Sequence, residues 1–314
     1  MEKILVTGGV GFIGSHLCNS LLSDGFAVVC LDNLITGNRG NIKSLLTNPN
    51  FEFIEADVIK PLTFDYLNLK YIFHLASPAS PIDYQNNSEE TLLANSLGTL
   101  NILNIAKEIK AKVLIASTSE IYGDPLEHPQ KEIYWGNANS FGPRSCYDES
   151  KRFAEAATYV FLNKYGIDAR IIRIFNTYGP NMRKDDGRVI SNFINWAING
   201  LPIKIDGDGS QTRSFCYITD LVSGIKKAMF TDGTRGEIFN LGNPDEFKIG
   251  DLSNKIIELT DSKSEVIFSN SFRPDDPMQR CPDITKAKGI LKWEPKVDLI
   301  DGLQKTIEYY KDLK

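Results

Sequence analysis

The sequence of 314 residues is poor in the residues that build metal centres and disulfide frameworks. Its three histidines, His16, His74 and His128, are isolated from one another, so we expect no metal site. The five cysteines are odd in number and include no C-x-x-C pair, which argues against both a disulfide framework and a zinc site. These cysteines are Cys18, Cys30, Cys146, Cys216 and Cys281.

Charge and hydropathy argue against two further classes of protein. The net charge of −5 argues against general nucleic-acid binding, so any anion site must be local. No apolar run is long enough to span a membrane. The first apolar run is entered at Lys3, which leaves no room for a signal peptide, and we therefore expect a cytoplasmic protein. The hydrophobic content of 42% and charged content of 24% are ordinary for a soluble globular protein.

What the sequence does contain is a glycine-rich turn near its start. A short apolar run at residues 4–6 leads into Gly8, and Gly9, Gly11 and Gly14 then follow the G-x-G-x-x-G spacing before an amphipathic run. This order predicts a strand, a turn and a helix. Glycines there let a pyrophosphate approach the main chain, and the helix N-terminus offers it free N–H groups.

Asp32 strengthens the prediction of a dinucleotide site. It ends a second apolar run, residues 27–31, and lies 18 residues after Gly14. A carboxylate at the end of the second strand can bind both hydroxyls of an adenosine ribose, and it repels a 2′-phosphate. The pattern favours NAD over NADP, the alternative being a structural turn followed by a strand-capping aspartate.

Apolar runs alternate with helical patterns along the first half of the chain. The runs cover residues 51–54, 71–75, 113–116 and 169–175, and helical patterns cover 89–109 and 147–165. Because parallel strands need crossover connections, this alternation predicts an α/β protein with a doubly wound parallel sheet, a Rossmann fold. Ligands bind at the carboxyl ends of such strands, where several polar residues fall. These residues are Asp32, Asp57, Ser77, Thr118 and Asn176.

After Asn176 the segments become shorter and are broken by proline and glycine. We therefore predict an NAD-binding Rossmann domain over residues 1–176. Residues 177–314 are predicted to form mainly a smaller, mixed substrate domain, with some segments returning to the Rossmann sheet. Helical patterns in this part cover residues 189–198, 220–230, 249–259 and 299–310.

Tyr147 and Lys151 are the first candidates for catalysis. Their i, i+4 spacing places them on one face of a helix. A nearby ammonium stabilises a phenolate and lowers the tyrosine pKa, as would a positively charged nicotinamide, so Tyr147 could act as a general base. Thr118, which leaves the preceding strand, could hydrogen-bond the alcohol being oxidised. A surface Tyr and Lys on a solvated helix is the alternative.

Together these motifs resemble the extended short-chain dehydrogenase/reductase family, with Thr118, Tyr147 and Lys151 in the triad positions. Within that family the chain is similar to the UDP-glucuronate decarboxylases, also called UDP-xylose synthases, over nearly its whole length. The matching stretches are residues 74–81, 118–125, 144–152 apart from Ser150, 173–177, 186–189, 209–213 and 275–277. The resemblance implies NAD as cofactor, a UDP-sugar substrate and a homodimer formed through helices at 89–109 and 147–165.

The resemblance also implies individual site residues. Cofactor contacts are expected at Gly8, Gly11, Phe12, Ile13, Asp32, Asn33, Thr36, Gly37, Asp57, Val58, Leu75, Ser77, Tyr147, Lys151, Thr177 and Arg188. Catalytic residues are expected at Thr118, Ser119, Glu120, Tyr147, Lys151 and Arg213, and substrate contacts at Asn176, Arg213, Arg273 and Arg280.

Some of these expectations leave alternatives open. The planar fork of Arg213 suits the paired oxygens of a diphosphate or a carboxylate. Arg273 and Arg280 could complete a diphosphate site or be ordinary exposed arginines. Asn176 could bind a sugar or phosphate, or satisfy a strand-end backbone group. Where the family often has Lys-Thr, this chain has Leu93 and Ala94, so a ligand contact there is in question.

The implied reaction is decarboxylation of UDP-glucuronate to UDP-xylose by C4 oxidation, loss of carbon dioxide and C4 re-reduction. Ser119 stands where related dehydratases place an acidic Asp, which favours decarboxylation over dehydration. Glu120 could destabilise the substrate carboxylate or act as a proton relay, and a solvated loop carboxylate is the alternative. A nucleotide-sugar 4-epimerase or 4,6-dehydratase remains a second interpretation. A non-catalytic NAD-binding sensor is a third, although such proteins often lose the Tyr or Lys that this chain keeps.

Overall fold

The computed structural model describes residues 1–269 and 279–313. Its centre is a seven-stranded sheet in the order β11-β6-β5-β4-β1-β2-β3, and every neighbouring pair of strands is parallel. The predicted doubly wound parallel sheet is thus confirmed. The strands are β1 (Lys3–Thr7), β2 (Ala27–Asp32), β3 (Phe51–Glu55), β4 (Leu69–His74), β5 (Lys112–Thr118), β6 (Ala169–Ile174) and β11 (Ile238–Leu241).

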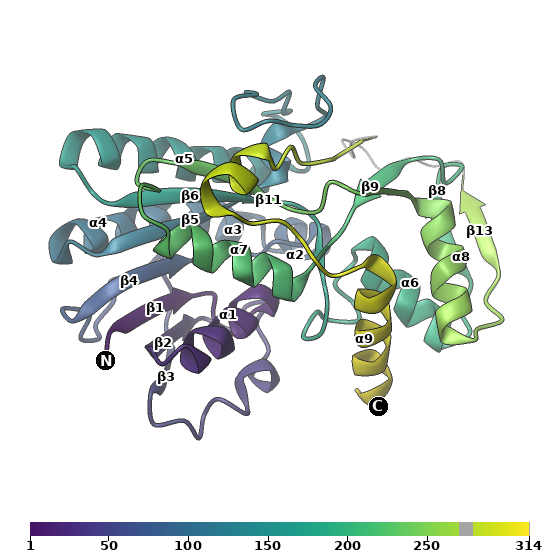
Figure 1. Ribbon diagram of the computed structural model, residues 1–314, viewed down its shortest axis with the longest axis horizontal. Helices are drawn as coiled ribbons and strands as arrows, with labels where there is room; N and C mark the ends of the chain where they lie inside the picture. The colour runs from purple at the N-terminus through teal and green to yellow at the C-terminus, as the bar shows by residue number, and fades with distance from the viewer. Residues whose placement is uncertain (270–278, 314) are drawn as a thin grey trace.

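Helices cover both faces of this sheet, because successive strand residues point to opposite sides and both sides are apolar. In β1, Ile4 and Val6 join one buried cluster, whereas Leu5 joins the other. The first face is covered by α1 (Phe12–Ser23) and α7 (Ile218–Phe230), and the second by α4 (Thr99–Ile109) and α5 (Ser145–Tyr165), as Figure 1 shows.

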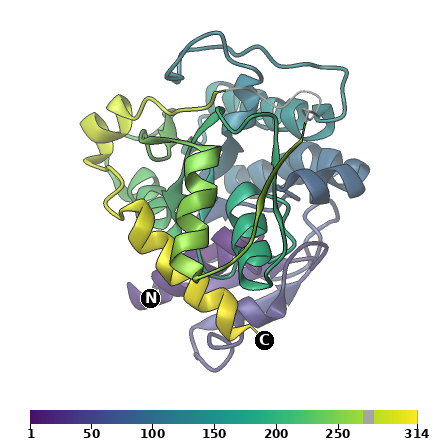
Figure 2. The same ribbon diagram turned by 90° about the vertical axis from the view of Figure 1, so that its right-hand side faces the viewer.

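The elements of the C-terminal half gather mainly at one end of the sheet (Figure 1), and Figure 2 shows α8 and α9 at the front of that end. Strand β11 and helix α7 return to the main sheet. The division at residue 176 into a cofactor domain and a substrate domain stays a prediction. The elements at this end are β7 (Thr177–Tyr178), α6 (Val189–Ile198), β8 (Ile203–Asp206), β9 (Thr212–Ser214), β10 (Cys216–Tyr217), β12 (Glu246–Lys248), α8 (Ile249–Thr260), β13 (Val266–Ser269) and α9 (Leu299–Asp312).

The helix expected over residues 89–109 is not continuous. It consists of α3 (Ser88–Leu93), a π-helical turn η2 (Ala94–Gly98) and α4. At this turn the buried Asn95 donates a 3.0 Å hydrogen bond to Ser150 of α5. A Cβ on Gly98 would lie 2.7 Å from a methyl of Val58, so the turn packs closely on its neighbour. Such π turns inside helices frequently occur at functional sites.

The remaining short elements are α2 (Pro81–Asn86), η1 (Arg39–Ile42), η3 (Ser119–Tyr122) and η4 (Ala287–Leu291). Within the described ranges, the helices are all too short or too polar to cross a membrane.

Candidate active site

A cavity of about 360 Å³ opens at the carboxyl ends of the central strands and reaches α6, β8 and β9. It is lined by every catalytic and cofactor residue expected from the sequence except Gly37. Gly37 instead lies beside Asp32, where an added Cβ would approach a carboxylate oxygen to 3.1 Å. The expected substrate residues Asn176, Arg213 and Arg280 also line the cavity, whereas Arg273 falls outside the described residues.

The glycine turn brings two strand ends together at the point where the sheet order reverses, between β1 and β4. Gly8 has φ +71°, and a Cβ on it would lie 2.8 Å from the backbone nitrogen of Ala76. A Cβ on Gly14 would lie 2.1 Å from the carbonyl oxygen of Gly8. Larger residues cannot occupy these positions without moving backbone, so the turn keeps the space beside the N-terminus of α1 open for an anion.

Asp32 ends β2 with its carboxylate at the cavity wall. One oxygen accepts a 3.0 Å hydrogen bond from the backbone N–H of Val10, and the other accepts a 2.9 Å bond from that of Leu34. Burial raises the pKa of Asp32, while these backbone donors oppose the rise. The side chain is therefore fixed in orientation. A carboxylate in this place and an open glycine turn fit the adenosine half of NAD.

Next along this edge, Asn33 donates a 3.1 Å hydrogen bond to the carboxylate of Asp57. The second oxygen of Asp57 accepts from the N–H of Ile59 at 3.1 Å. These bonds hold the loop after β3 against the end of β2, so both loops border the same part of the cavity.

Tyr147 and Lys151 lie on α5 as expected, and both are buried. Burial raises the pKa of Tyr147 to about 12, and a hydrogen bond with Thr118 opposes the rise. Lys151 donates a 2.8 Å hydrogen bond to the carbonyl of Ala116, and its Nζ lies 5.8 Å from the centre of the Tyr147 ring. Burial lowers the pKa of Lys151 to about 7. The depressed tyrosine pKa expected from Lys151 is thus not found in the protein alone, because burial outweighs the hydrogen bond with Thr118.

Tyr84, on α2, is a site residue that sequence reasoning missed. Its ring stacks on Tyr147 with centroids 4.9 Å apart and planes 5° apart. Its hydroxyl is buried and has no hydrogen-bond partner among the residues that the structure describes. Burial raises the pKa of Tyr84, so it stays a neutral phenol. The stack fixes the plane of Tyr147, and no local spacing in the sequence signals this contact between α2 and α5.

Glu120 is the centre of a charged group at the end of β5. Its two carboxylate oxygens pair separately with Arg144 and Arg280. Burial alone would raise the pKa of Glu120, yet these two guanidinium groups, with a contribution from Arg213, lower it to about 2. Glu120 is thus an ionised, enclosed carboxylate rather than a solvated loop residue. Arg144 is a second residue that sequence reasoning did not single out.

Asp148 lies next to this group and was also missed. It is buried, and its Oδ2 lies 3.9 Å from Arg144. Burial, followed by the negative charge of Glu120, raises the pKa of Asp148 to about 7. Two neighbouring carboxyl groups therefore have pKa values that differ widely, but only Glu120 lines the cavity. Ser119, between the strand end and Glu120, is buried and lines the cavity.

The remaining expected contact residues also line the cavity. Thr177 and Arg188 line it, and Arg188 donates a 3.1 Å hydrogen bond to the carbonyl of Ala79. Arg213 is half-buried on β9 and donates a 2.9 Å bond to the carbonyl of Thr212. Of the two positions that depart from the family pattern, Ala94 lines the cavity and Leu93 does not.

Behind the cavity, a buried polar network fixes the end of β5. Ser117 donates a 2.5 Å hydrogen bond to Glu155 of α5, and Glu155 forms a two-pronged ion pair with Arg173. Arg173 in turn donates to the hydroxyl of Tyr122, which donates to Asn240 of β11. Because β5, α5, β6 and β11 are tied by this network, Thr118 and Tyr147 lie on rigid elements.

The parallel sheet, the glycine turn, Asp32 and the Thr118, Tyr147 and Lys151 group together define an extended short-chain dehydrogenase/reductase. A family model described as GDP-mannose 4,6 dehydratase matches residues 5–306. UDP-glucuronic acid decarboxylase 6 of Arabidopsis thaliana is 50% identical over 302 residues, which cover 96% of this chain and 86% of that protein. UDP-glucuronic acid decarboxylase 1 of Xenopus tropicalis is 47% identical over 310 residues, covering 99% and 72%. The chain belongs to the UDP-glucuronic acid decarboxylase family.

Solved structures agree on the fold. UDP-glucuronic acid 4-epimerase from Bacillus cereus, in complex with UDP-glucuronic acid and NAD, has a TM-score of 0.89 and 32% identity, covering 99% of this chain and all of that one. UDP-glucose 4-epimerase from Thermotoga maritima has a TM-score of 0.88 and 29% identity, covering 99% of each chain. The relatives in sequence are decarboxylases, while these neighbours in structure are epimerases with lower identity.

Proposed function

We propose that this chain is an NAD-dependent UDP-glucuronate decarboxylase that forms UDP-xylose. The observation that carries the proposal is Glu120, half-buried and ionised between Arg144 and Arg280, with the buried Ser119 beside it. A dehydratase needs an acid at the position of Ser119 to expel a hydroxyl, and serine lacks that acidity. The full-length similarity to UDP-glucuronic acid decarboxylases supports the same reaction.

The roles of the residues follow from their placement. Bound NAD supplies the acceptor and later the donor of the C4 hydride, and its positively charged ring favours the Tyr147 phenolate. Tyr147 takes the proton of the C4 hydroxyl and later returns it, and Thr118 orients that hydroxyl. Lys151, held by the carbonyl of Ala116, lies beside the Tyr147 ring and would add a positive charge there when protonated. Gly8, Gly11, Asp32 and the other expected cofactor residues hold NAD along the ends of β1 and β2.

The charged group governs the second half of the reaction. A C4 ketone lies β to the C6 carboxylate, so it can accept the electrons that carbon dioxide leaves behind. We propose that Ser119 hydrogen-bonds the departing carboxylate and that Glu120 holds Arg144 and Arg280 in place beside it. Asn176, Arg213 and Arg280 bind the UDP-sugar, as the paired oxygens of a diphosphate suit arginine.

The product identifies the reaction. Purified protein is incubated with UDP-glucuronate and a trace of NAD, and carbon dioxide and nucleotide-sugar mass are measured. The proposal predicts one carbon dioxide per UDP-pentose and no accumulation of NADH. A product with unchanged mass would instead establish a 4-epimerase, the alternative favoured by the structural neighbour that binds UDP-glucuronic acid. A product lighter by one water would establish a dehydratase.

We also propose a homodimer formed through residues 89–109 and 147–165, that is through α3, η2 and α4 together with α5, against which they pack. Large apolar side chains remain exposed on α5, including Tyr159 at 67% and Val160 at 52%. Large apolar side chains exposed on the same helix support a protein interface there. Sedimentation would show a dimer, and charge introduced at Val160 would dissociate it.

A cytoplasmic location and a role in UDP-xylose supply complete the proposal. All five cysteines are free, as is usual in a reducing compartment. We further propose that residues 1–176 bind mainly NAD and residues 177–314 mainly the nucleotide sugar, since α6, β8 and β9 border the far side of the cavity.

A further inference from the structure

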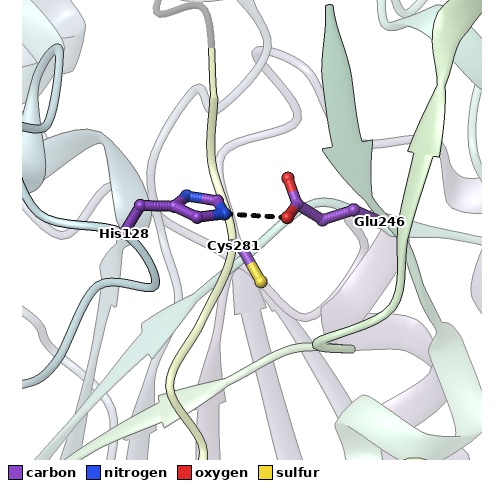
Figure 3. Close-up of side chains that lie close together, drawn as sticks. All are labelled: His128, Glu246 and Cys281. Atoms are coloured by element: carbon purple, nitrogen blue, oxygen red, sulfur yellow. Dashed lines mark hydrogen bonds and ion pairs between the residues drawn. The ribbon is translucent and has the colours of Figure 1, made fainter.

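Three side chains with metal-binding atoms meet outside the active-site cavity (Figure 3). They are His128, on the loop after η3, Glu246, on β12, and Cys281, on the segment that follows the undescribed residues. The Nε2 of His128 lies 2.8 Å from a carboxylate oxygen of Glu246. The three potential ligand atoms all lie within 4.8 Å of one another. In sequence these residues are more than 30 positions apart, so their spacing gave no sign of the cluster.

Each of the three positions is fixed by its neighbours. Cys281 and Gln130, two residues after His128, are joined by two hydrogen bonds: the N–H of Cys281 donates to the side chain of Gln130 at 3.0 Å, and the N–H of Gln130 donates to the carbonyl of Cys281 at 2.9 Å. The second carboxylate oxygen of Glu246 accepts a 2.7 Å bond from Thr212 on β9. A hydrogen bond behind a ligand is the arrangement that orients carboxylates in metal sites.

We propose that His128, Glu246 and Cys281 form a site for a borderline-soft divalent cation, with Zn²⁺ as the best match. Imidazole nitrogen, carboxylate oxygen and thiolate sulfur are its usual ligands, at about 2.0–2.3 Å. Ligand atoms at those distances around a tetrahedral ion are about 3.3–3.7 Å apart. The observed separations, from 2.8 Å to within 4.8 Å, require side-chain shifts of about 1 Å or less. A water molecule completes four-coordination.

The electrostatic surroundings suit a cation. Besides Glu246, the carboxylates of Asp245 and Asp283 lie close enough to act on the thiol. The negative charges of Glu246, Asp245 and Asp283 all act at this thiol. Metal binding would release the thiol proton to solvent as the sulfur bonds to the metal. The hydrogen bond between His128 and Glu246 would be replaced by one bond from each side chain to the metal. A bound cation would offset the negative charges of Glu246, Asp245 and Asp283.

The site would join three segments that lie next to two cavity arginines. Cys281 directly follows Arg280, and Phe247, next to Glu246, pairs with Arg213 across β9 and β12. A cation there would stabilise the position of both arginines without touching substrate. This role is structural, and it holds whether or not the proposed decarboxylation is correct.

The test uses the full chain, stripped of metal by a chelator and then titrated with ZnCl₂ or CoCl₂. Calorimetry gives the stoichiometry and affinity, and Co²⁺ gives an absorption band for thiolate coordination. We expect one Zn²⁺ per chain and a thiolate band in the wild type. His128→Ala and Cys281→Ser should each weaken binding by more than about 100-fold, because even partners behind metal ligands cost 10–100-fold. Cys281→Ser should also abolish the thiolate band.

His16→Ala is the matched control, because it removes an imidazole that bonds the carbonyl of Pro180, far from the cluster. It should bind Zn²⁺ like the wild type. Circular dichroism of each variant verifies folding before titration. Absence of a thiolate band, or Zn²⁺ affinity that is unchanged by Cys281→Ser or equally weakened by His16→Ala, would overturn the proposal. Zn²⁺ should also raise the unfolding temperature of the wild type but not of Cys281→Ser.

Discussion

Replacing Glu120 by Gln tests whether the charged group at the end of β5 is as strongly coupled as its geometry indicates. Glu120, Arg144 and Arg280 have side chains only 16%, 11% and 4% exposed. Glutamine has nearly the same shape, so the substitution removes the charge and leaves both guanidinium groups enclosed without their counter-ion. Removing one partner of a buried pair typically costs about 3–5 kcal/mol.

The lowered pKa of Glu120 gives a second measure of the stability that these ion pairs contribute. Holding this pKa at about 2, against an ordinary value of 4.5, corresponds to about 3 kcal/mol of stability at neutral pH. Because the pKa is depressed in the folded state, this stability is fully present above pH 4.5 and is lost as pH falls towards 2. Protonated glutamate resembles glutamine, so wild type and Glu120→Gln should converge in stability over the same range.

Urea unfolding at a series of pH values measures the difference directly. At pH 7 the variant should be about 3 kcal/mol less stable, and the gap should shrink below pH 4.5. Glu52→Gln is the control: its 3.2 Å pair with Lys3 joins side chains that are 56% and 33% exposed, so its loss should cost at most about 1 kcal/mol. Equal losses for the two variants, or a Glu120→Gln deficit independent of pH, would refute the reasoning.

Three substitutions address the other parts of the site. Tyr147→Phe should abolish turnover while leaving the fold and NAD affinity nearly intact, because only the proton-transfer group is lost; full residual activity would reassign the base. Asp32→Asn should weaken NAD binding more than NADP binding, since the charge that repels a 2′-phosphate is removed, and tighter NADP binding in the wild type would contradict this. Arg213→Ala should weaken UDP-glucuronate binding by about 10–100-fold, the worth of a charge-assisted hydrogen bond, and spare NAD. Calorimetry with each ligand decides both binding predictions, and unchanged UDP-glucuronate affinity after Arg213→Ala would exclude the substrate role.

Local patterns in the sequence predicted the parts of this molecule that are built locally. The turn around Gly8 and Gly14 and the pair Tyr147 and Lys151 depend on spacings of a few residues within one strand, turn or helix. The helix predicted at residues 189–198 matches α6 at both ends, because its apolar period is a local pattern. Alternation of strands and helices was sufficient to predict the parallel sheet.

Contacts between distant segments could not be predicted in this way. Arg280 reaches Glu120 across 160 residues, and Tyr84 stacks on Tyr147 from a different helix. The pKa of Tyr147 was also beyond prediction, because burial is a property of the folded chain. The π turn at residues 94–98 interrupts a helical pattern that looks continuous in sequence, and it lies where Gly98 packs closely on the distant Val58.

The most direct test of the account follows hydrogen at two carbons of the sugar. UDP-glucuronate carrying deuterium at C4 is converted in ordinary water with a trace of NAD, and unlabelled substrate is converted in heavy water. If one chain oxidises, decarboxylates and re-reduces the sugar, the first product is UDP-xylose that keeps deuterium at C4. The second product carries a single solvent deuterium, at C5, and none at C4. Solvent deuterium at C4, or NADH formed in proportion to product, would contradict the closed hydride cycle and indicate a simple dehydrogenase.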